Sequence, residues 1–177
     1  DVVSGAYEHT IKLQGKKQYF TAFVQQARAP QIVLAVSTKT MPNYKTLADL
    51  RGKKIGVTAP GSSTNMVASF VLDGAGVSSK EVSFIGVGAG SGAVAAMKTG
   101  QIDAIANLDP VISSLERDGA IKVLVDTRKM DATRQVFGGD MPAGSLYAPE
   151  AFIKANPKTV QGMTNAMVKA ARWIQQA

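Results

Sequence analysis

The chain has 177 residues, of which 45% are hydrophobic and 19% charged, a balance typical of a folded globular protein and unlike that of a disordered tail or a coiled coil. Its net charge of +7 comes from scattered lysines and arginines without interleaved aromatic residues, which argues against a nucleic-acid-binding surface. The chain has no cysteine and one histidine, His9, which excludes disulfides and thiolate metal sites and argues against a zinc site.

The first forty residues are expected to form strands around one short helix. Val2 and Val3 are interpreted as the end of a buried strand, and a helix is predicted over residues 8 to 14. Two β-type segments follow, "YFTAFVQQ" and "QIVLAVS", separated by Pro30. A strand without neighbours at the start and an uncapped helical pattern at "WIQQA" predict a fragment that lacks material at both ends.

The centre of the chain alternates between strands and helices. Strands are predicted at residues 55–58, 82–87, 102–107 and 121–126, with helices at 63–73, 93–99 and 110–118 between them. This order predicts a parallel sheet with helices on its faces. "GGDMPAGSLY" breaks the pattern. From Pro157 onward an amphipathic helix is predicted, whose apolar stripe comprises Val160, Met163, Met167, Ala170 and Ile174.

The alternation suggests one α/β lobe inserted into another. Residues 39–142 are expected to form a complete lobe two, while residues 1–38 and 143–177 belong to lobe one. The chain would cross between the lobes near residues 36–40 and 139–144. A two-segment crossing of this kind acts as a hinge, and hinged lobes enclose ligands.

The turn "TAPGSST" is the strongest candidate for a ligand contact. It follows a predicted strand, and ligands bind beyond the carboxyl ends of parallel strands. Gly61 allows close backbone approach, and Ser62, Ser63 and Thr64 place hydroxyls and N–H groups at a helix N-terminus that favours an anion or a carbonyl oxygen. One hydroxyl can instead act only as the N-cap, worth about 1 kcal/mol. Both interpretations remain open from the sequence.

Two further strand ends, at residues 86–92 and 107–110, point to the same edge of the predicted sheet. Asn107 can both donate and accept hydrogen bonds, and Asp109 can bind an amine or cap the helix that begins at Pro110. In the other lobe, Ser4, Gly5 and Ala6 repeat the strand–glycine–helix arrangement, which describes a cleft that binds a small solute without transforming it. The lone His9 is interpreted as a capping or surface residue.

A dinucleotide site is the main rival interpretation. Residues 90–95 read G-x-G-x-x-A between a strand and a helix, and Asp109 follows about 20 residues on, where such folds carry a ribose-binding acid. The predicted helix is short, the turn is unusually rich in glycine, and no residue pair suggests hydride transfer. G-x-x-x-x-G-K-[ST], G-x-S-x-G and S-x-x-K motifs are absent from the sequence, which argues against a nucleotide cradle and a serine hydrolase.

Four stretches, "DVVSGAYEHT", "LADLRGKKIGVTAPGSST", "AAMKTGQIDAIANLDP" and "PEAFIKANPKTVQ", resemble the periplasmic solute-binding proteins of ABC transporters, in the nitrate/sulfonate/taurine and thiamine-precursor-like family. The resemblance implies a type II periplasmic-binding fold, α/β in class, with two hinged lobes and with the signal and first strands absent here. The ligand contacts that it implies are Ser4, Gly5, Ala6, Tyr7, Ser62, Ser63, Thr64, Asn107 and Asp109, beside Gly61 from the turn.

Two departures from the family pattern bear on the solute. Leu108 stands where sulfonate-binding members usually carry Trp, so an alkanesulfonate does not follow from the resemblance. The cysteine-rich motif of the pyrimidine-synthesising enzymes on this fold has no counterpart, which argues against the enzyme interpretation.

The resulting hypothesis is a non-catalytic, extracytoplasmic solute-binding component of an ABC importer without cofactor or metal. Its partners would be a small organic anion or polar solute and the membrane permease. The full-length protein is expected to be a monomer in the periplasm, or outside the cell as a membrane-anchored lipoprotein. The alternatives are a sensor domain of the same fold and a pyrimidine- or dinucleotide-dependent enzyme. The identity of the solute, the oligomeric state of the fragment and the roles of the individual turn hydroxyls stay open.

Overall fold

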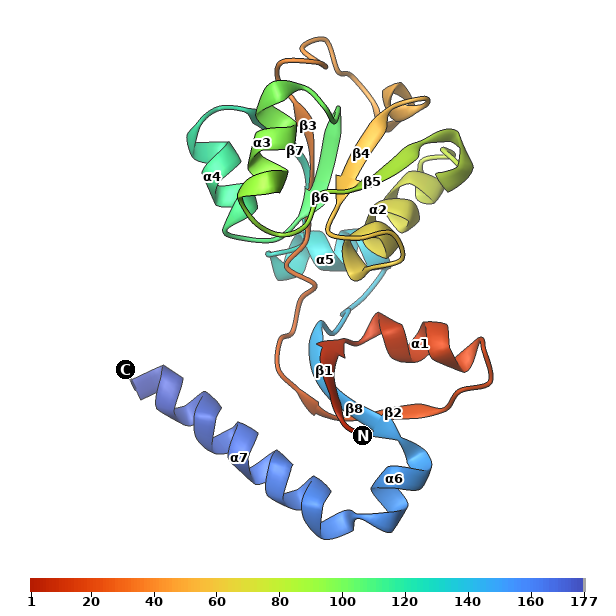
Figure 1. The fold of residues 1–177 in the computed structure, drawn as a ribbon, viewed down its shortest axis with the longest axis vertical. Coiled ribbons are helices and arrows are strands. Elements are labelled where there is room, and N and C mark those ends of the chain that lie inside the picture. The colour runs from red at the N-terminus through yellow and green to blue at the C-terminus, as the bar shows by residue number, and fades with distance from the viewer. Residues whose placement is uncertain (177) are drawn as a thin grey trace. The chain divides into compact units, whose positions relative to one another are not determined.

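The computed structural model describes residues 1–176, and the chain divides into two compact units (Figure 1). Unit 1 comprises Asp1–Pro30 and Met141–Ala177, and unit 2 comprises Gln31–Asp140. The division differs from the expected lobe boundaries at 38/39 and 142/143, because strand β3 (Val33–Ser37) pairs within the sheet of unit 2.

Unit 2 is built on a five-stranded sheet of order β5-β4-β6-β3-β7. The four other strands are β4 (Lys54–Val57), β5 (Ser83–Gly86), β6 (Ala104–Asn107) and β7 (Ile121–Asp126). β4 is parallel to β5 and β6, whereas β3 runs antiparallel to both β6 and β7. The four predicted strands therefore run in the same direction, as expected, but β3, which was expected in lobe one, lies antiparallel between β6 and β7. All five residues of β3 are buried, so this strand takes an inner position that pairs both of its edges.

Helices cover both faces of this sheet (Figure 1). Helices α3 (Ser91–Thr99) and α4 (Val111–Arg117) pack on one face, in a core cluster that includes Met97 and Ile112. Helix α2 (Ser63–Gly74) and the last residue of helix α5 (Met130–Phe137) pack with the cluster on the other face. Two short 3₁₀ turns, η1 (Leu47–Leu50) and η2 (Ser79–Glu81), complete the unit.

The structure corrects the sequence analysis for two of these helices. The buried side of α2 carries Val67, Ala68 and Leu72, while Phe70 is 50% exposed and stacks on Phe137 with ring centroids 5.0 Å apart. The spacing of Met66, Val67, Phe70 and Val71 predicts instead that these residues share one apolar face of the helix. Helix α5 was not predicted, because its sequence follows β7 without a preceding glycine or proline turn.

Unit 1 has a three-stranded antiparallel sheet of order β1-β8-β2. Its strands are β1 (Val3–Ala6), β2 (Phe20–Gln25) and β8 (Gly144–Pro149), and its helices are α1 (Glu8–Gln14), α6 (Glu150–Ala155) and α7 (Pro157–Gln176). The central strand β8 lies in the stretch that seemed only to break the pattern. Val3 begins β1 and is 38% exposed, so the expected buried strand end is wrong. Ser4, Gly5 and Ala6 lie inside β1 rather than in a turn after it.

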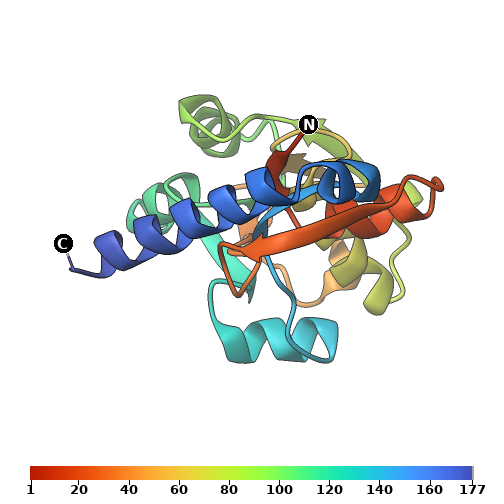
Figure 2. The same cartoon turned by 90° about the horizontal axis from the view of Figure 1, so that it is seen from below.

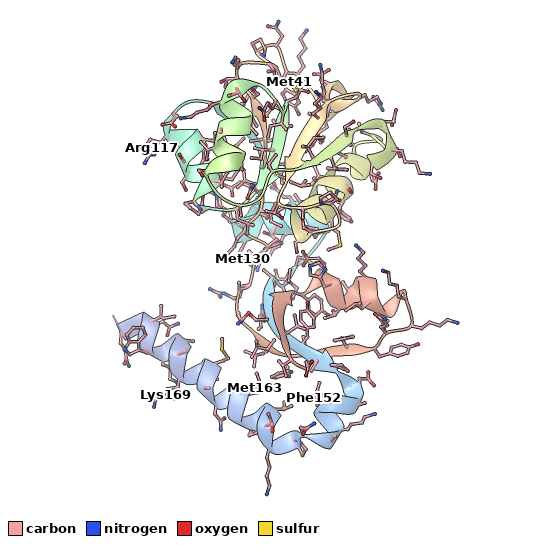
Figure 3. The ribbon with its side chains drawn as sticks, viewed as in Figure 1. Met41, Arg117, Met130, Phe152, Met163 and Lys169 are labelled. Atoms are coloured by element: carbon pink, nitrogen blue, oxygen red, sulfur yellow. The ribbon has the colours of Figure 1, made fainter. Side chains whose placement is uncertain are left out.

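The predicted C-terminal helix is present as α7, and it packs in part on β2 (Figure 2). The expected apolar stripe is half-buried at Val160, Met163 and Met167, but Ile174 is 67% exposed. Figure 3 labels Met163 and, further along the helix, the exposed Lys169. Among the described helices, none is both long enough and apolar enough to cross a membrane.

Candidate functional site

One edge of the unit 2 sheet carries most of the candidate residues. Strands β4, β5, β6 and β7 all end at this edge, because β4, β5 and β6 are parallel and β6 and β7 both oppose β3. Val33, at the start of β3, pairs with Asn107 at the end of β6 and with Asp126 at the end of β7. The segments that follow β4, β5, β6 and β7 are therefore neighbours at this edge.

The turn between β4 and α2 holds a closed triangle of hydroxyl groups. The Oγ1 atom of Thr58 lies 3.0 Å from Ser62 Oγ and 3.0 Å from Thr64 Oγ1, and the last two atoms are 2.8 Å apart. Thr64 Oγ1 also accepts a hydrogen bond of 2.9 Å from the backbone N–H of Thr58. Thr64 is only 1% exposed. Its hydroxyl therefore ties the strand end to the first turn of the helix and does not reach the surface.

Ser62 is the N-cap of α2. Its backbone is extended, and its Oγ accepts a hydrogen bond of 3.4 Å from the N–H of Asn65. Gly61 has a φ of 78°, a left-handed conformation that suits glycine, and its N–H donates to Asn65 Oδ1 at 2.8 Å. Capping is thus the task of Ser62, and Thr64 is internal. Gly61 is exposed and Ser63 is half-buried, so these two residues form the outer part of the turn.

Asn107 holds the neighbouring loop in place. It is fully buried, its Nδ2 donates to the carbonyl oxygen of Gly88 at 2.9 Å, and its Oδ1 accepts from the N–H of Leu108 at 2.9 Å. These bonds fix the end of β6 against the glycine-rich loop that follows β5. The structure gives Asn107 a supporting role at this edge.

Asp109 caps the helix that follows β6. Its Oδ1 accepts from the N–H of Ser113 at 3.0 Å and from the Ser113 hydroxyl, and the Asp109–Pro110 peptide bond is cis. The hydrogen bond from the Ser113 hydroxyl, helped by Arg128, lowers the pKa of Asp109 below its ordinary value. Of the two roles open from the sequence, the structure shows capping. A carboxylate used in this way is a poor counterpart of the ribose-binding acid of a dinucleotide fold.

Arg128, just after β7, forms ion pairs with three carboxylates. The sequence did not predict this cluster. Its guanidinium lies 2.9 Å from Asp126, 3.0 Å from Glu116 and 3.4 Å from Asp109. The hydrogen bonds that its guanidinium donates to Asp126 and Glu116 raise the pKa of Arg128. One cation among three anions leaves this corner net negative. Because the three acids come from different elements, no spacing in the sequence points to the cluster.

A hollow of about 350 Å³ lies beside this cluster, lined by Gln31, Leu108, Asp109 and Arg128. Gln31 has a φ of 62°, an uncommon conformation for a residue other than glycine. Its N–H donates to the carbonyl oxygen of Thr127 at 3.1 Å, which anchors it beside β7.

The glycine-rich segment at residues 87–92 leads into α3, whose N-cap is Gly90. The helix has nine residues, and Ala93 in its first turn is fully buried. Close packing of the helix on the sheet explains the small residue at Ala93. Gly88 and Gly90 are exposed with open space where a Cβ would lie, and Gly88 has a φ of 71°. Within residues 1–176, no group of three or more His, Cys, Asp or Glu side chains is arranged to hold a metal ion.

The remaining candidates belong to unit 1. Ser4 Oγ donates to Gln26 Oε1 at 3.2 Å, and the N–H of Tyr7 donates to the carbonyl oxygen of Ala143 at 2.9 Å. Gly5 lies against Tyr147, where an added Cβ would come 2.7 Å from the phenol oxygen. Ser4, Gly5, Ala6 and Tyr7 are thus held on β1 and at the start of α1, whereas the six other candidates lie on the edge of unit 2.

Comparison with known proteins identifies similar chains. Residues 6–177 match the model of the NMT1-like family. A solved structure from Bordetella bronchiseptica RB50 is 60% identical, with a TM-score of 0.96, over 100% of this chain and 56% of that chain. The alkanesulfonate-binding protein SsuA from Xanthomonas axonopodis pv. citri, solved with MOPS bound, is 25% identical, with a TM-score of 0.60, over 83% of this chain and 48% of its own.

A third similar structure is the periplasmic nitrate-binding protein NrtA from Synechocystis PCC 6803. It is 16% identical, with a TM-score of 0.68, and the match covers 98% of this chain and 47% of NrtA. The chain spans about half the length of these solved structures. It shares the periplasmic-binding-protein fold with them. None of the curated proteins compared with the sequence matches it.

Proposed function

Because the chain belongs to the NMT1-like family, we propose that it is part of the extracytoplasmic solute-binding component of an ABC importer. The match of residues 6–177 to that family is the observation that carries the proposal. The similar folds of an alkanesulfonate-binding protein and a nitrate-binding protein support it.

The solute in this proposal is a small organic anion or polar molecule, sulfonate-, nitrate- or taurine-like, or pyrimidine-like. The β4–α2 turn supports an anionic group. Helix α2 has twelve residues and no acidic residue in its first turn, so the positive end of its dipole is not neutralised there. The exposed Gly61 and the half-buried Ser63 place backbone and hydroxyl groups at that end.

The proposed contacts differ in role. Gly61, Ser62 and Ser63 would meet the solute directly, whereas Thr64 and Asn107 would hold the turn and the adjacent loop in position. Asp109 would act indirectly, by holding the start of α4 in place at this edge, since its carboxylate already accepts hydrogen bonds from Ser113. From unit 1, the proposed contacts are Ser4, Gly5, Ala6 and Tyr7.

The proposal includes the cellular setting. The protein would be non-catalytic, would act as a monomer in the periplasm or on the outer side of the membrane, and would deliver its solute to a membrane permease. The named neighbours are binding proteins, which supports a role in binding over the pyrimidine- or dinucleotide-dependent enzyme.

Isothermal titration calorimetry tests the proposal. The purified chain is titrated with MOPS, with nitrate, and with morpholine as a control that lacks the sulfonate. We expect MOPS or nitrate to bind and morpholine not to bind. Ser63→Ala is expected to weaken anion binding about fivefold to tenfold, since one hydrogen bond to a charged group is lost. The matched variant Ser79→Ala, on the half-buried residue that begins η2, should leave binding unchanged.

Two results would contradict the proposal at different levels. If neither anion binds to the unaltered chain, a sulfonate- or nitrate-like solute is wrong. If the anion binds equally well to Ser63→Ala and Ser79→Ala, the β4–α2 turn is only a helix cap and the solute is held elsewhere.

A further inference from the structure

Helix α1 runs beside strand β2 in unit 1 (Figure 1), and a hollow of about 310 Å³ lies between them. Thr10 and Gln14 line it from one face of α1, since residues four apart on a helix are neighbours. Tyr19 and Phe20 line it at the start of β2, and Glu150 lines it at the start of α6. Every lining residue belongs to unit 1. Small-molecule sites have volumes of about 300–1,000 Å³, so this hollow suits a small ligand.

Three aromatic residues line the hollow. Tyr7 and Tyr19 are two of the four tyrosines in the chain, and Phe20 is the third aromatic residue. The Phe20 ring packs edge-on against Tyr147, with centroids 6.1 Å apart, and the N–H of Tyr7 donates to the carbonyl oxygen of Ala143 at 2.9 Å. Tyr19 is 55% exposed, so much of its side chain is open to a ligand. The face of an aromatic ring attracts cations, so these residues favour a positively charged ligand.

Glu150 gives the hollow a negative charge. Among the described residues that line the hollow, it alone is charged, although the chain as a whole carries +7. Its N–H donates to the carbonyl oxygen of Tyr19 at 3.2 Å, which fixes the two residues beside each other. Its ion pair with Lys154 is long, at 3.9 Å, and the two side chains are 52% and 80% exposed. An exposed pair of this kind is weak, so the carboxylate can also bind the cation of a ligand.

We propose that this hollow is a second binding site, which takes a small alkylammonium ion between the aromatic residues and Glu150. The rings contact the apolar groups of such an ion and attract its charge, and the carboxylate attracts the same charge. A divalent metal ion fits less well, because it needs several oxygen ligands and the hollow offers one carboxylate. The inference goes beyond the proposed function and does not depend on it, since no residue of the β4–α2 turn takes part. Tyr7 is the one lining residue that is also a proposed solute contact.

Choline and 3,3-dimethyl-1-butanol form a pair of probes for this site. The two compounds have the same shape, but choline has a charged nitrogen where the alcohol has a neutral carbon. Each is titrated into the full chain and followed by ¹H–¹⁵N NMR. We expect choline to shift the backbone amides of Thr10, Tyr19 and Thr21 saturably, and the neutral alcohol to bind at least about tenfold more weakly. The amides of residues 61–63 should stay in place when choline is added.

Two matched pairs of variants separate the aromatic and the charged contributions. Tyr19→Leu keeps an apolar side chain but removes the ring, and should weaken choline binding about threefold to fivefold, whereas Tyr19→Phe keeps the ring and should stay within about twofold. Glu150→Gln should weaken choline binding about fivefold. Its control is Asp131→Asn, which removes a carboxylate on a side chain that is 94% exposed in unit 2, and should bind choline as the unaltered chain does. Circular dichroism verifies that all four variants remain folded.

Three results would overturn this proposal. Equal affinity for choline and the neutral alcohol would show an apolar groove without selectivity for a cation. Binding of neither compound would show that the hollow is not a site for ions of this class. Equal choline affinity in Tyr19→Leu and Tyr19→Phe, or in Glu150→Gln and Asp131→Asn, would remove the residues to which the binding is assigned. None of these results bears on anion binding at the β4–α2 turn, which the titration with MOPS and nitrate tests separately.

Discussion

Two turns at the same edge of the unit 2 sheet each connect a strand to the start of the next helix, but different interactions hold them in place. After β4, the hydroxyls of Thr58, Ser62 and Thr64 bond to one another and to the backbone, with no charged group in the triangle. After β6, Asp109 caps the helix and is joined through Arg128 to Glu116 and Asp126.

The difference lies in what each turn leaves for a ligand. In the charged cluster, one guanidinium is shared by three carboxylates, so both its charge and its donors are used inside the protein. The neutral triangle uses only two side chains of the helix start and leaves the positive end of the α2 dipole without a neighbouring acid. This contrast supports the proposal that the neutral turn receives the solute, while the charged turn stabilises the edge.

The largest expected effect comes from removing the centre of the charged cluster. Arg128→Met leaves three carboxylates without their shared partner, and because the arginine side chain is only 25% exposed, we expect a loss of about 2–3 kcal/mol in the free energy of unfolding. Urea denaturation measures it. The matched variant Arg117→Met, on a side chain that is 78% exposed (labelled in Figure 3), should cost less than about 0.5 kcal/mol. Equal losses in the two variants would show that the cluster does not stabilise this edge.

The neutral triangle is tested by Thr64→Val. Valine keeps the shape of the buried side chain but removes the oxygen that accepts from the N–H of Thr58, so we expect a loss of about 1–2 kcal/mol in the same urea assay. Thr99→Val, at an exposed threonine at the end of α3, serves as control and should change stability by less than about 0.5 kcal/mol. If Thr64→Val is as stable as Thr99→Val, the hydroxyl triangle does not stabilise the protein.

Of the two turns, only the charged one, whose Asp109 pairs with Arg128, should contribute less to stability at acidic pH. The hydrogen bond from Arg128 lowers the pKa of Asp126, and that from Ser113 lowers the pKa of Asp109, both below the ordinary value near 4. Carboxylates with a lowered folded-state pKa contribute stability above their unfolded pKa and lose it as the pH falls through the folded one. The free energy of unfolding should therefore fall as the pH drops below about 4.

The two variants make this pH test specific. Arg128→Met is expected to show a shallower decline than the unaltered chain, because the pKa of Asp126 moves back towards its ordinary value. Thr64→Val should decline in parallel with the unaltered chain. Parallel declines in all three proteins would place the acid sensitivity elsewhere in the molecule.

Of the expected effects, the change of the stability losses of these two variants with salt concentration should be the smallest. Raising the ionic strength to about 1 M shortens the screening length to about 3 Å and should reduce the stability lost in Arg128→Met by about 0.5 kcal/mol. The loss in Thr64→Val involves no charge and should stay constant. Urea denaturation at two salt concentrations measures both, and a salt-dependent loss in Thr64→Val would contradict the assignment of that turn as neutral.

The parts of the fold that could be predicted from the sequence are those determined locally. The strands and helices from β4 to β7 follow from apolar periodicity and from glycines at the helix ends. The direction of β3 and the strand β8 could not be predicted, because pairing partners far away in the chain determine both. Helix α5 was missed for a local reason, because no glycine or proline turn separates its sequence from β7.

The candidate site shows the same division. The turn at residues 58–64 was recognisable because its small hydroxyl residues lie next to one another. The sequence could not assign the cap to Ser62 and the internal bond to Thr64, since these roles depend on backbone direction and burial. Arg128 was missed because its partners come from the β6–α4 turn, from α4 and from β7.

A ¹H–¹⁵N NMR titration of the full chain with MOPS tests the central claim most directly. The account predicts that the backbone amides of Gly61, Ser62 and Ser63 shift most among those of unit 2, because they lie at the start of α2. The amides of Ser113 and Arg128, which donate to carboxylates within the charged cluster, should stay in place. Saturable binding of MOPS with the largest unit 2 shifts at Ser113 and Arg128, and none at Gly61 to Ser63, would contradict it.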